Sequence, residues 1–307
     1  MKISVIIPTK NAERFLNNLF LRLKEQLLRP HQLIIVDSSS TDATLKIATQ
    51  FNAQIIQIKE EEFNHGKARN LGASVATGDV FVFMTQDVIP ADKNLLKNLT
   101  SPLSQNFIGA SYARQIPKAD ANPIEIYFRT FNYPNKKIIK EINQTSELGI
   151  KTFFFSNVCS AIRKDIFEEI GGFPEDVIIN EDMFFASEVL KKGYKIVYEP
   201  SAVVYHSHNY SFFSLFKRYF DIGVFMKNYH IGQNDMLAEK EGIKYLIGLT
   251  RFLIKNNVKW LPYAVVDTMT RFLGYKLGLM EKHIPIKIKS KISLNKNFWK
   301  QYAKANP

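Results

Sequence analysis

The sequence predicts an α/β fold with a mostly parallel, Rossmann-like sheet, helices on both faces and a helical extension at the C-terminus. One observation is that short apolar runs alternate with longer mixed segments over roughly the first hundred residues. A second is that these runs are almost continuous in Val, Ile, Leu and Phe, as in strands buried on both sides. The third is a helical spacing of apolar residues among Lys and Arg after residue 231.

The elements expected in the first part alternate between strands and helices. The strands are ISVIIP, LIIVDS, IIQI and VFVFM, and the helices lie near residues 11–28, 42–51 and 66–76. An open α/β sheet binds its ligand beyond the carboxyl ends of its strands. Three polar loops, residues 9–11, 37–40 and 85–87, follow such ends, so we expect them to converge on one crevice.

From about residue 107 the pattern changes to mixed strands and short helices. The strand-like segments are IGASYARQI, TFFFSNVCSAIR and YKIVYEPSAVVYH, and helices are expected near residues 165–170 and 182–192. No linker rich in Gly, Ser or Pro separates the two parts, so we expect one domain over residues 1–230. Residues 231–307 are expected to form a basic amphipathic helical extension.

The composition is that of a globular protein with an anionic partner. The 307 residues are 46% hydrophobic and 23% charged, which excludes a disordered or fibrous chain. Lys and Arg total 41 against 29 acidic residues, and the net charge of +12 favours phosphate, nucleic acid or lipid headgroups. The single cysteine, Cys159, cannot form an internal disulfide, and no signal peptide or membrane span is expected, so a cytoplasmic location is the default.

Asp87 follows the VFVFM strand within the sequence TQDVIP. Asp and Pro are common in turns, so a turn alone explains this segment. A carboxylate at a strand end also provides the hard oxygen ligand that Mg²⁺ or Mn²⁺ prefers, and such an ion neutralises charge on a diphosphate. Both interpretations stay open at this point.

Six segments together resemble family 2 glycosyltransferases of the GT-A fold. They are PTKN at 8–11, VDSSSTDAT at 36–44, HGKARNLG at 65–72, TQD at 85–87, GGFPED at 171–176 and ED at 181–182. The resemblance covers roughly residues 1–225, and its order and spacing are more specific than any one segment. The combination of FNHGKARN, TQD and YHSHNYS is most similar to bacterial rhamnosyltransferases, which use dTDP-L-rhamnose to build cell-surface polysaccharides.

The resemblance implies a nucleotide-binding part at about residues 1–105 and an acceptor-binding part at about residues 106–230. Asp37 matches the acid that reads the pyrimidine base, and Arg69 is the first choice for a diphosphate contact, with Lys67 second. Helix capping and a solvated helix face are the ordinary explanations for such residues. The full set implied for the nucleotide sugar is Pro8, Thr9, Asn11, Asp37, Ser39, Lys67, Arg69, Gln86 and Arg218.

Asp182 matches the general base of the family, which deprotonates an acceptor hydroxyl for attack at the anomeric carbon. An acidic pair at a helix N-terminus is also explained by the helix dipole alone. Attack on the face opposite the leaving group inverts the configuration and needs no covalent enzyme intermediate. The residues implied around the acceptor are Gly172, Phe173, Glu181 and Asn157, although a helix stop and a strand edge explain some of them equally.

The expected metal site departs from the usual family pattern at Thr85, which stands where the first acid of an Asp-x-Asp motif is common. His206 and His208 are two apart in an expected strand and therefore face the same side. An imidazole of this pair, His206 before His208, is expected to join Asp87 around Mg²⁺ or Mn²⁺. Surface or capping roles for the two histidines are the alternative.

The expected partners are a nucleotide-diphosphate sugar donor, dTDP-L-rhamnose first, and a saccharide or lipid-linked acceptor. Aromatic residues such as Phe272 among the cations of the tail predict contact with the inner leaflet of a membrane, with a helical cap or dimer contact as the alternative.

A UDP-hexose is the nearest alternative to dTDP-L-rhamnose as the donor. A nucleotidyltransferase needs a Gly-rich loop that PTKN lacks, and no nucleic acid is expected because the cations are spread and weighted to the tail. The sequence specifies no oligomeric state.

Overall fold

The computed structural model describes residues 1–229, 231 and 235–305 of the chain. Its described strands form one sheet in the order β3-β2-β1-β4-β8-β6-β9-β5, with β7 also paired to β9. The strands β3, β2, β1 and β4 run parallel, whereas β8 runs antiparallel between β4 and β6. The strands are β1 (Ile3–Thr9), β2 (Gln32–Asp37), β3 (Gln54–Gln57), β4 (Val80–Met84), β5 (Ile89–Pro90), β6 (Ile108–Ile116), β7 (Ile138–Lys140), β8 (Cys159–Arg163) and β9 (Lys195–Tyr205).

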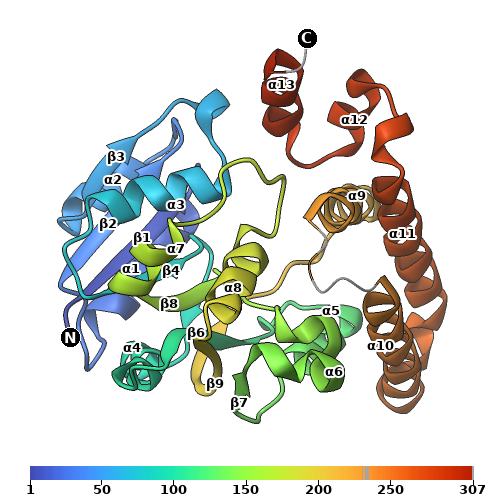
Figure 1. Cartoon of the computed structure of the whole chain (residues 1–307), viewed down its shortest axis with the longest axis horizontal. Coiled ribbons are helices and arrows are strands. Elements are labelled where there is room, and N and C mark those ends of the chain that lie inside the picture. The colour runs from blue at the N-terminus through green and yellow to red at the C-terminus, as the bar shows by residue number, and fades with distance from the viewer. Residues whose placement is uncertain (230, 232–234, 306–307) are drawn as a thin grey trace.

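Helices flank the sheet and continue into the C-terminal extension, which confirms the predicted α/β class (Figure 1). Those within the sheet domain are α1 (Glu13–Lys24), α2 (Thr44–Gln50), α3 (His65–Ser74), α4 (Leu95–Thr100), α5 (Pro123–Asn132), α6 (Thr145–Leu148), α7 (Lys164–Ile170), α8 (Glu181–Lys191) and α9 (Phe212–Tyr229). Those that follow are α10 (Asp235–Asn256), α11 (Leu261–Leu279), α12 (Ile286–Ile292) and α13 (Lys296–Ala305).

The central strands are buried on both faces, which explains their continuous apolar sequences. In β4, Phe81 and Phe83 pack in one cluster with residues of α3, α7 and α8. Val82 and Met84 point the other way and pack with residues of α1 and α4. Successive side chains of a strand point to opposite faces, so each β4 residue fills one of two cores.

The packing of α3 against β1 depends on a glycine. A Cβ added at Gly72 would lie 2.4 Å from Cγ2 of Ile6, so only glycine permits this close approach of helix and strand. Asn64 caps the first turn of α3, because its side chain accepts a hydrogen bond from the backbone N–H of Lys67 at 3.1 Å. This helix therefore starts at a fixed place beside the carboxyl ends of the strands.

The three loops that the sequence predicts to converge do meet. Thr9 and Asp37, the last residues of β1 and β2, are direct partners in the parallel pairing. The loop after β4 joins them through Gln86, whose Oε1 accepts a hydrogen bond from the backbone N–H of Lys10 at 2.8 Å. The carboxyl ends of β1, β2 and β4 thus share one edge of the sheet, as an open α/β sheet requires.

The C-terminal helices pack back onto the sheet domain (Figure 1). α11 lies along α9 with glycines at the contact, where a Cβ at Gly278 would lie 2.2 Å from the carbonyl oxygen of Phe220. α13 reaches the loop after β3, because Asn297 Nδ2 donates to the carbonyl of Glu60 at 2.8 Å. The predicted domain boundary at residue 230 lies outside the described residues. No helix within the described ranges is both long and apolar enough to cross a membrane.

Candidate active site

The loops after β1 and β2 form one end of the site. Asp37 is fully buried, and its carboxylate accepts hydrogen bonds from the Thr9 hydroxyl at 2.9 Å and from the backbone N–H and hydroxyl of Ser40 at 2.8 and 2.6 Å. Pro8, half-buried, precedes Thr9 within β1. These contacts fix the carboxylate of Asp37 in place before any ligand binds.

Asn11 and Ser39 lie on the exposed side of the same two loops. Their backbones are left-handed, with φ values of 47° and 60°, a conformation that residues other than glycine rarely adopt. Asn11 Oδ1 accepts a hydrogen bond from the backbone N–H of Thr41 at 2.9 Å, and Lys10 Nζ donates to the carbonyls of Ser38 and Ser39 at 2.9 and 2.8 Å. The two loops therefore hold each other in a defined shape.

Gln86 joins the loop after β4 to the loop after β1. Besides accepting from the backbone N–H of Lys10, its Nε2 donates to the carbonyl of Lys10 at 3.1 Å. Both ends of the amide are thus occupied by main-chain groups. The consequence is a rigid position for the next residue, Asp87.

Asp87 lies beside both histidines that the sequence proposed as its partners. The Nε2 atoms of His206 and His208 lie 3.4 and 3.3 Å from Asp87 Oδ2 and 3.0 Å from each other. Two ligand atoms about 2.1 Å from one ion and at right angles to each other are about 3.0 Å apart, so this triangle fits one face of a metal coordination shell. Among the described residues the three therefore form a possible cation site.

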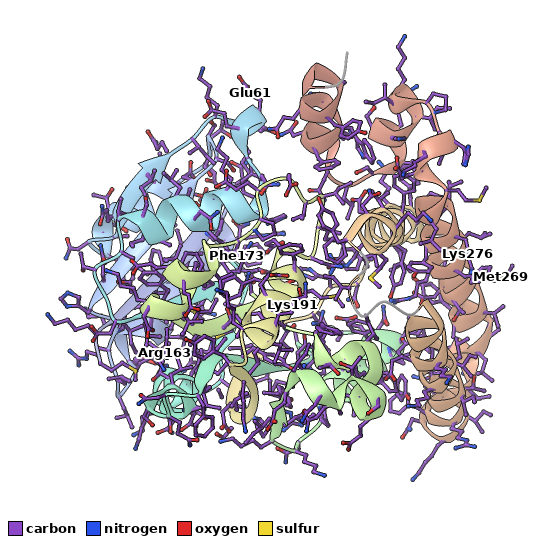
Figure 2. All side chains as sticks on the ribbon, viewed as in Figure 1. Glu61, Arg163, Phe173, Lys191, Met269 and Lys276 are labelled. Atoms are coloured by element: carbon purple, nitrogen blue, oxygen red, sulfur yellow. The ribbon has the colours of Figure 1, made fainter. Side chains whose placement is uncertain are left out.

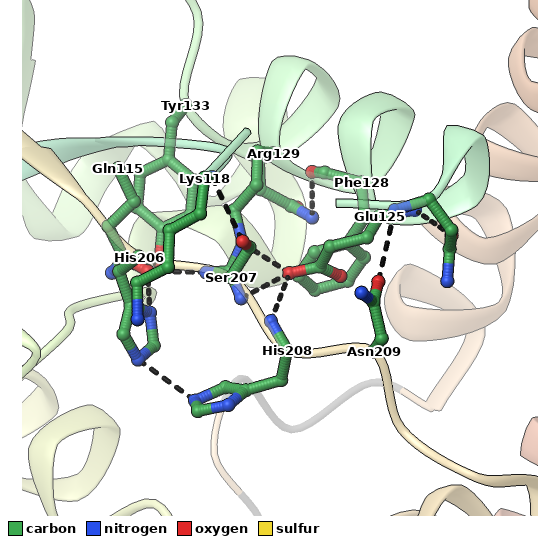
Figure 3. A network of polar contacts seen from close by, with 12 residues as sticks. Gln115, Lys118, Glu125, Phe128, Arg129, Tyr133, His206, Ser207, His208 and Asn209 are labelled. Atoms are coloured by element: carbon green, nitrogen blue, oxygen red, sulfur yellow. Dashed lines mark hydrogen bonds and ion pairs between the residues drawn. The ribbon is translucent and has the colours of Figure 1, made fainter. Parts of the chain in front are cut away.

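A buried network behind the histidines sets their orientation (Figure 3). Gln115 Oε1 lies 3.0 Å from His206 Nδ1 and also accepts a hydrogen bond from Arg129. An amide oxygen only accepts, so His206 Nδ1 carries the proton and its Nε2 lone pair is directed to the possible cation site. Glu125, paired with Arg129 at 2.6 Å, accepts a hydrogen bond from the backbone N–H of His208 at 3.2 Å. His206 is thus held by Gln115 of β6, which Arg129 of α5 supports, and His208 is held by Glu125 of α5.

The histidines do not lie in a strand, as the sequence suggested, but directly after one. β9 ends at Tyr205, and the only continuation of the pairing described there is a hydrogen bond from the backbone N–H of His206 to the carbonyl of Ile116 at 3.0 Å. Beyond it the chain leaves the sheet to contact α5, because the backbone of His208 bonds to Glu125 instead. The side chains of the two histidines nevertheless face the same carboxylate.

The electrostatics of this cluster suit a cation. Burial acts to raise the pKa of Asp87, but the contacts with His206 and His208 outweigh burial and hold that pKa well below its ordinary value. Burial lowers the pKa of His206 and lowers that of His208 to about 4. At neutral pH the cluster therefore consists of one carboxylate and two uncharged imidazoles, the protonation state that metal ligation requires.

A second cluster lies at the N-terminus of α8. Glu181 Oε1 accepts a hydrogen bond from Nη1 of Arg69 at 2.7 Å, and both side chains are almost fully buried. Asp182 is oriented by two backbone donors, the N–H of Asn157 at 3.1 Å and the N–H of Met183 at 2.8 Å. Arg69 comes from α3, so this ion pair ties α8 to α3.

The two acids of the pair have opposite pKa shifts. Burial raises the pKa of Asp182 to about 7, and the adjacent carboxylate of Glu181 adds to the rise. Burial acts on Glu181 in the same direction, but the Arg69 guanidinium holds the pKa of Glu181 below its ordinary value. Asp182 thus exchanges its proton near neutral pH, which is the property of an effective general base.

The acid pair and the Asp–His cluster belong to one site because the segment 156–158 connects them. The carbonyl of Val158 accepts a hydrogen bond from the backbone N–H of Thr85 at 3.1 Å, because β8 begins beside the end of β4. The backbone N–H of Asn157 donates to Asp182. The hydroxyl of Ser156 accepts a hydrogen bond from Gln115 Nε2 at 2.9 Å. The loop after β4, the start of α8 and the network under the histidines therefore form a continuous polar region.

The other residues predicted from the sequence have diverse positions. Lys67 is exposed on α3, and Arg218 is half-buried on α9. Phe173 lies in the core rather than at an open surface, with its ring centre 5.0 Å from that of Phe83 (Figure 2). Gly172 has a φ of 81° in the turn that follows α7, as a chain reversal at a Gly pair requires.

Sequence reasoning missed Gln115, Lys118, Glu125 and Arg129. Lys118 Nζ lies 4.0 Å from Asp87 Oδ2, and the other three form the network under the histidines. The one available signal was Glu125 and Arg129 at helical i,i+4 spacing after Asn-Pro, a pattern that usually marks an exposed helical ion pair. Nothing in the spacing linked that pair to the histidines.

Comparison with known proteins identifies the family of this chain. The model of the family "Glycosyl transferase family 2" matches residues 4–171, and that of "Glycosyl transferase family group 2" matches residues 115–264. The chain is 42% identical to the O-antigen chain rhamnosyltransferase RfbN of Salmonella typhimurium, over 97% of this chain and 96% of that protein. It is 43% identical to the O-antigen chain rhamnosyltransferase WbaN of Salmonella anatum, over 96% and 95% of the two chains.

A solved structure supports the fold. The mannosyltransferase PcManGT from Pyrobaculum calidifontis, in complex with GDP-Man and Mn²⁺, superimposes with a TM-score of 0.65 at 17% identity, covering 92% of this chain and 88% of that one. At this identity the likeness concerns the fold alone. The relatives confirm the resemblance to bacterial rhamnosyltransferases that the motifs predicted. The chain belongs to glycosyl transferase family 2 and is a glycosyltransferase.

Proposed function

We propose that this glycosyltransferase moves an L-rhamnosyl group from dTDP-L-rhamnose to a saccharide or lipid-linked saccharide acceptor during synthesis of a cell-surface polysaccharide. The observation that carries the proposal is the 42% identity to the O-antigen chain rhamnosyltransferase RfbN. This identity extends over 97% of the chain and 96% of that protein, so the likeness is not confined to one segment.

In the proposed reaction an acceptor hydroxyl attacks the anomeric carbon of the donor while Asp182 takes the hydroxyl proton. The new bond joins the acceptor oxygen to the anomeric carbon, the bond from that carbon to the diphosphate oxygen breaks, and dTDP leaves with inversion of configuration. The pKa of Asp182 near 7 supports this role, because the carboxylate is then both available and basic enough to accept the proton. Glu181, paired with Arg69, keeps its charge and so favours the return of Asp182 to the protonated form.

The residues Asp87, His206 and His208 fit a divalent cation, Mg²⁺ or Mn²⁺, which we assign to them. The support is the spacing of their three ligand atoms and the orientation of His206 by Gln115. When bound, such an ion supplies positive charge to the diphosphate of the leaving nucleotide. Lys118, 4.0 Å from Asp87, provides a further cation at the same place.

For the donor we assign the nucleoside to the loops around Asp37. The three hydrogen bonds to its carboxylate leave one of about four acceptor positions, on Oδ2, for the imide N–H of a pyrimidine base. Arg69 is buried against Glu181, so we assign it to the acid pair and the diphosphate contacts to Arg218 and Lys67.

A panel of nucleotide sugars tests the donor. The protein is mixed with Mn²⁺ and each of dTDP-L-rhamnose, UDP-glucose, UDP-galactose and UDP-N-acetylglucosamine, and both thermal stabilisation and release of the nucleoside diphosphate are measured. We expect the dTDP sugar alone to give both signals. Stabilisation by a UDP-hexose without a response to dTDP-L-rhamnose would contradict the rhamnosyl assignment while leaving the family unchanged.

A further inference from the structure

The helix α11 points its large apolar side chains outward. Its side toward α9 is built from small residues such as Gly274 and Gly278, where added Cβ atoms would lie 2.5 and 2.2 Å from backbone oxygens of α9. Figure 2 labels Met269 and Lys276 at the outer edge of the molecule. The exposed apolar residues, with their exposed fractions, are Val265 (59%), Val266 (47%), Met269 (57%), Phe272 (57%) and Leu273 (54%). Folding usually buries such a face, so its exposure indicates a binding surface.

The neighbouring helix α10 extends the same kind of surface. Its inward residues Leu249 and Leu253 are buried in a small core that also contains Ala264 of α11. Its described exposed apolar residues are Ile243 (57%), Leu246 (37%), Ile247 (49%) and Ile254 (61%), which recur at helical spacing. The outward faces of α10 and α11 together are named here the apolar–basic face.

The charges of this region are almost all positive on the outside. Between residues 242 and 305 the acidic residues are Asp267 and Glu281. Both are buried, and they pair with Arg271 and Lys289 respectively. The exposed cations include Arg251, Lys255 and Lys259, for which the described residues offer no ion pair. From residue 242 on, the described part of the apolar–basic face therefore presents cations and apolar groups without an exposed carboxylate, whereas Glu241 of α10 pairs with Lys151 and Lys244.

We propose that the apolar–basic face docks on an anionic lipid bilayer. A bilayer surface satisfies both features at once, because anionic headgroups attract the cations while Met269 and Phe272 enter the region below the headgroups. A second copy of the chain would bring identical cations against each other. A nucleic acid would neutralise Lys255 and its neighbours but would leave the apolar side chains against phosphates.

The apolar–basic face is mechanically joined to the catalytic region. Arg271 of α11 donates a hydrogen bond to the Tyr219 hydroxyl on α9 at 2.7 Å, and its guanidinium lies 5.6 Å from the ring centre of Phe128. Phe128 belongs to α5, the helix whose Glu125 holds the backbone of His208. Docking would therefore hold the site at a fixed height above the bilayer. The proposal does not depend on which sugar is transferred.

Vesicle co-sedimentation of the full chain tests the proposal. The protein is mixed with vesicles of phosphatidylcholine and phosphatidylglycerol, or of phosphatidylcholine alone, at low and high salt. We expect binding to the anionic vesicles, weakened by salt, and little binding to the neutral ones. The triple variant Arg251→Glu, Lys255→Glu, Lys259→Glu should bind more than about 100-fold more weakly, since one cation near an anionic surface contributes about fivefold.

A second variant tests the apolar part. Met269→Ser with Phe272→Ser should lose about tenfold in vesicle affinity for each side chain, because each loses the burial of a large apolar group. Matched controls remove similar groups elsewhere: Leu21→Ser with Leu27→Ser for exposed apolar residues, and Lys24→Glu with Lys46→Glu for exposed cations. The controls should bind vesicles like the wild type. Thermal unfolding with and without dTDP shows that every variant is folded and retains its nucleotide site.

Three results would overturn the proposal. Equal binding of the wild type to neutral and anionic vesicles, or no binding at all, would exclude an anionic bilayer as the partner of the apolar–basic face. A wild-type dimer that the Met269 and Phe272 changes convert to a monomer, without vesicle binding, would assign the face to a second copy. Salt-sensitive binding of duplex DNA that the charge reversals abolish, again without vesicle binding, would assign it to nucleic acid.

Discussion

Two carboxylates of the same site, Asp87 and Asp182, have opposite environments. Asp87 faces two imidazoles, whose contacts hold its pKa well below the ordinary value despite burial. Asp182 faces backbone donors and the carboxylate of Glu181, and burial raises its pKa to about 7. The comparison teaches that one fold makes both a permanent anion and a proton acceptor from the same amino acid, by choosing what each carboxylate contacts.

The difference depends on partners that lie far away in the sequence. The histidines beside Asp87 come from the segment after β9, and Gln115 of β6 and Glu125 of α5 orient them. Next to Asp182, Arg69 pairs with Glu181 and not with Asp182 itself. A cation that served both acids would lower both pKa values and would remove the base.

The largest effect is expected for Asp182→Asn, which removes the proposed base. Turnover should fall by about 1,000-fold, the contribution that general base catalysis typically makes. Donor binding, measured by thermal stabilisation with dTDP-L-rhamnose and Mn²⁺, should be retained because Asp87 and the histidines are untouched. Glu188→Gln on the same helix is the control and should turn over normally. A variant at Asp182 with unchanged turnover would refute the base assignment.

The next effect concerns Asp87→Asn, the other half of the comparison. We expect the loss of stabilisation by Mn²⁺ together with dTDP, and turnover at least about 100-fold lower, because a bound ion contributes several kcal/mol to the developing charge. Asp92→Asn, an exposed carboxylate in the following loop, is the matched control. Mn²⁺ titration by calorimetry provides the direct measurement. Retained Mn²⁺ affinity in Asp87→Asn would place the metal elsewhere.

A smaller effect is expected from Gln115→Met, which leaves all three possible ligands in place. The change removes the acceptor that fixes the proton of His206 on Nδ1, so Mn²⁺ affinity should fall about 10- to 100-fold, the usual cost of losing an orienting partner. Gln115→Glu keeps an acceptor oxygen and should restore most of the affinity. Tyr133→Phe removes the hydroxyl that accepts from Gln115 Nε2 but leaves the bond between Gln115 Oε1 and His206, so it should leave Mn²⁺ affinity unchanged. Equal losses in all three variants would indicate general destabilisation of the network.

The sequence was sufficient for β1 to β4, for the edge where they meet and for the neighbourhood of Asp87, whereas β5 and β7 were not among the predicted strands. Strands buried on both faces leave a continuous apolar signal, and parallel strands bring the residues after them together. That is why Asp37, Gln86 and Asp87 were found from their place in the chain. The pairing of Asp87 with His206 and His208 also followed, although the strand expected around the histidines ends one residue earlier.

The parts that the sequence could not specify depend on which face of a helix turns inward. Arg69 was expected to reach the diphosphate, but it shares a face of α3 with Gly72, which packs against β1, so it is buried beside Glu181. Glu125 and Arg129 look like an exposed ion pair and become a buried support only through contacts with β6 and the histidines. Such roles come from tertiary packing, which local spacing does not encode.

The smallest effect is on stability and distinguishes the two acids by its pH dependence. The pKa of Asp182 is about 7 in the folded protein and about 3.9 when unfolded, so the protonated acid favours the fold. This stabilisation is complete below about pH 4 and is lost as the pH rises through 7. Asp182→Asn carries no such dependence, so its Tm relative to the wild type should rise by at least about 2 °C between about pH 5.5 and about pH 8. The amide loses one hydrogen bond to a backbone N–H, but that loss is the same at every pH. The control Glu188→Gln should show no such trend. Parallel curves of Tm against pH for Asp182→Asn and the wild type would mean that Asp182 titrates like an ordinary carboxylate. The contrast with Asp87 would then be lost.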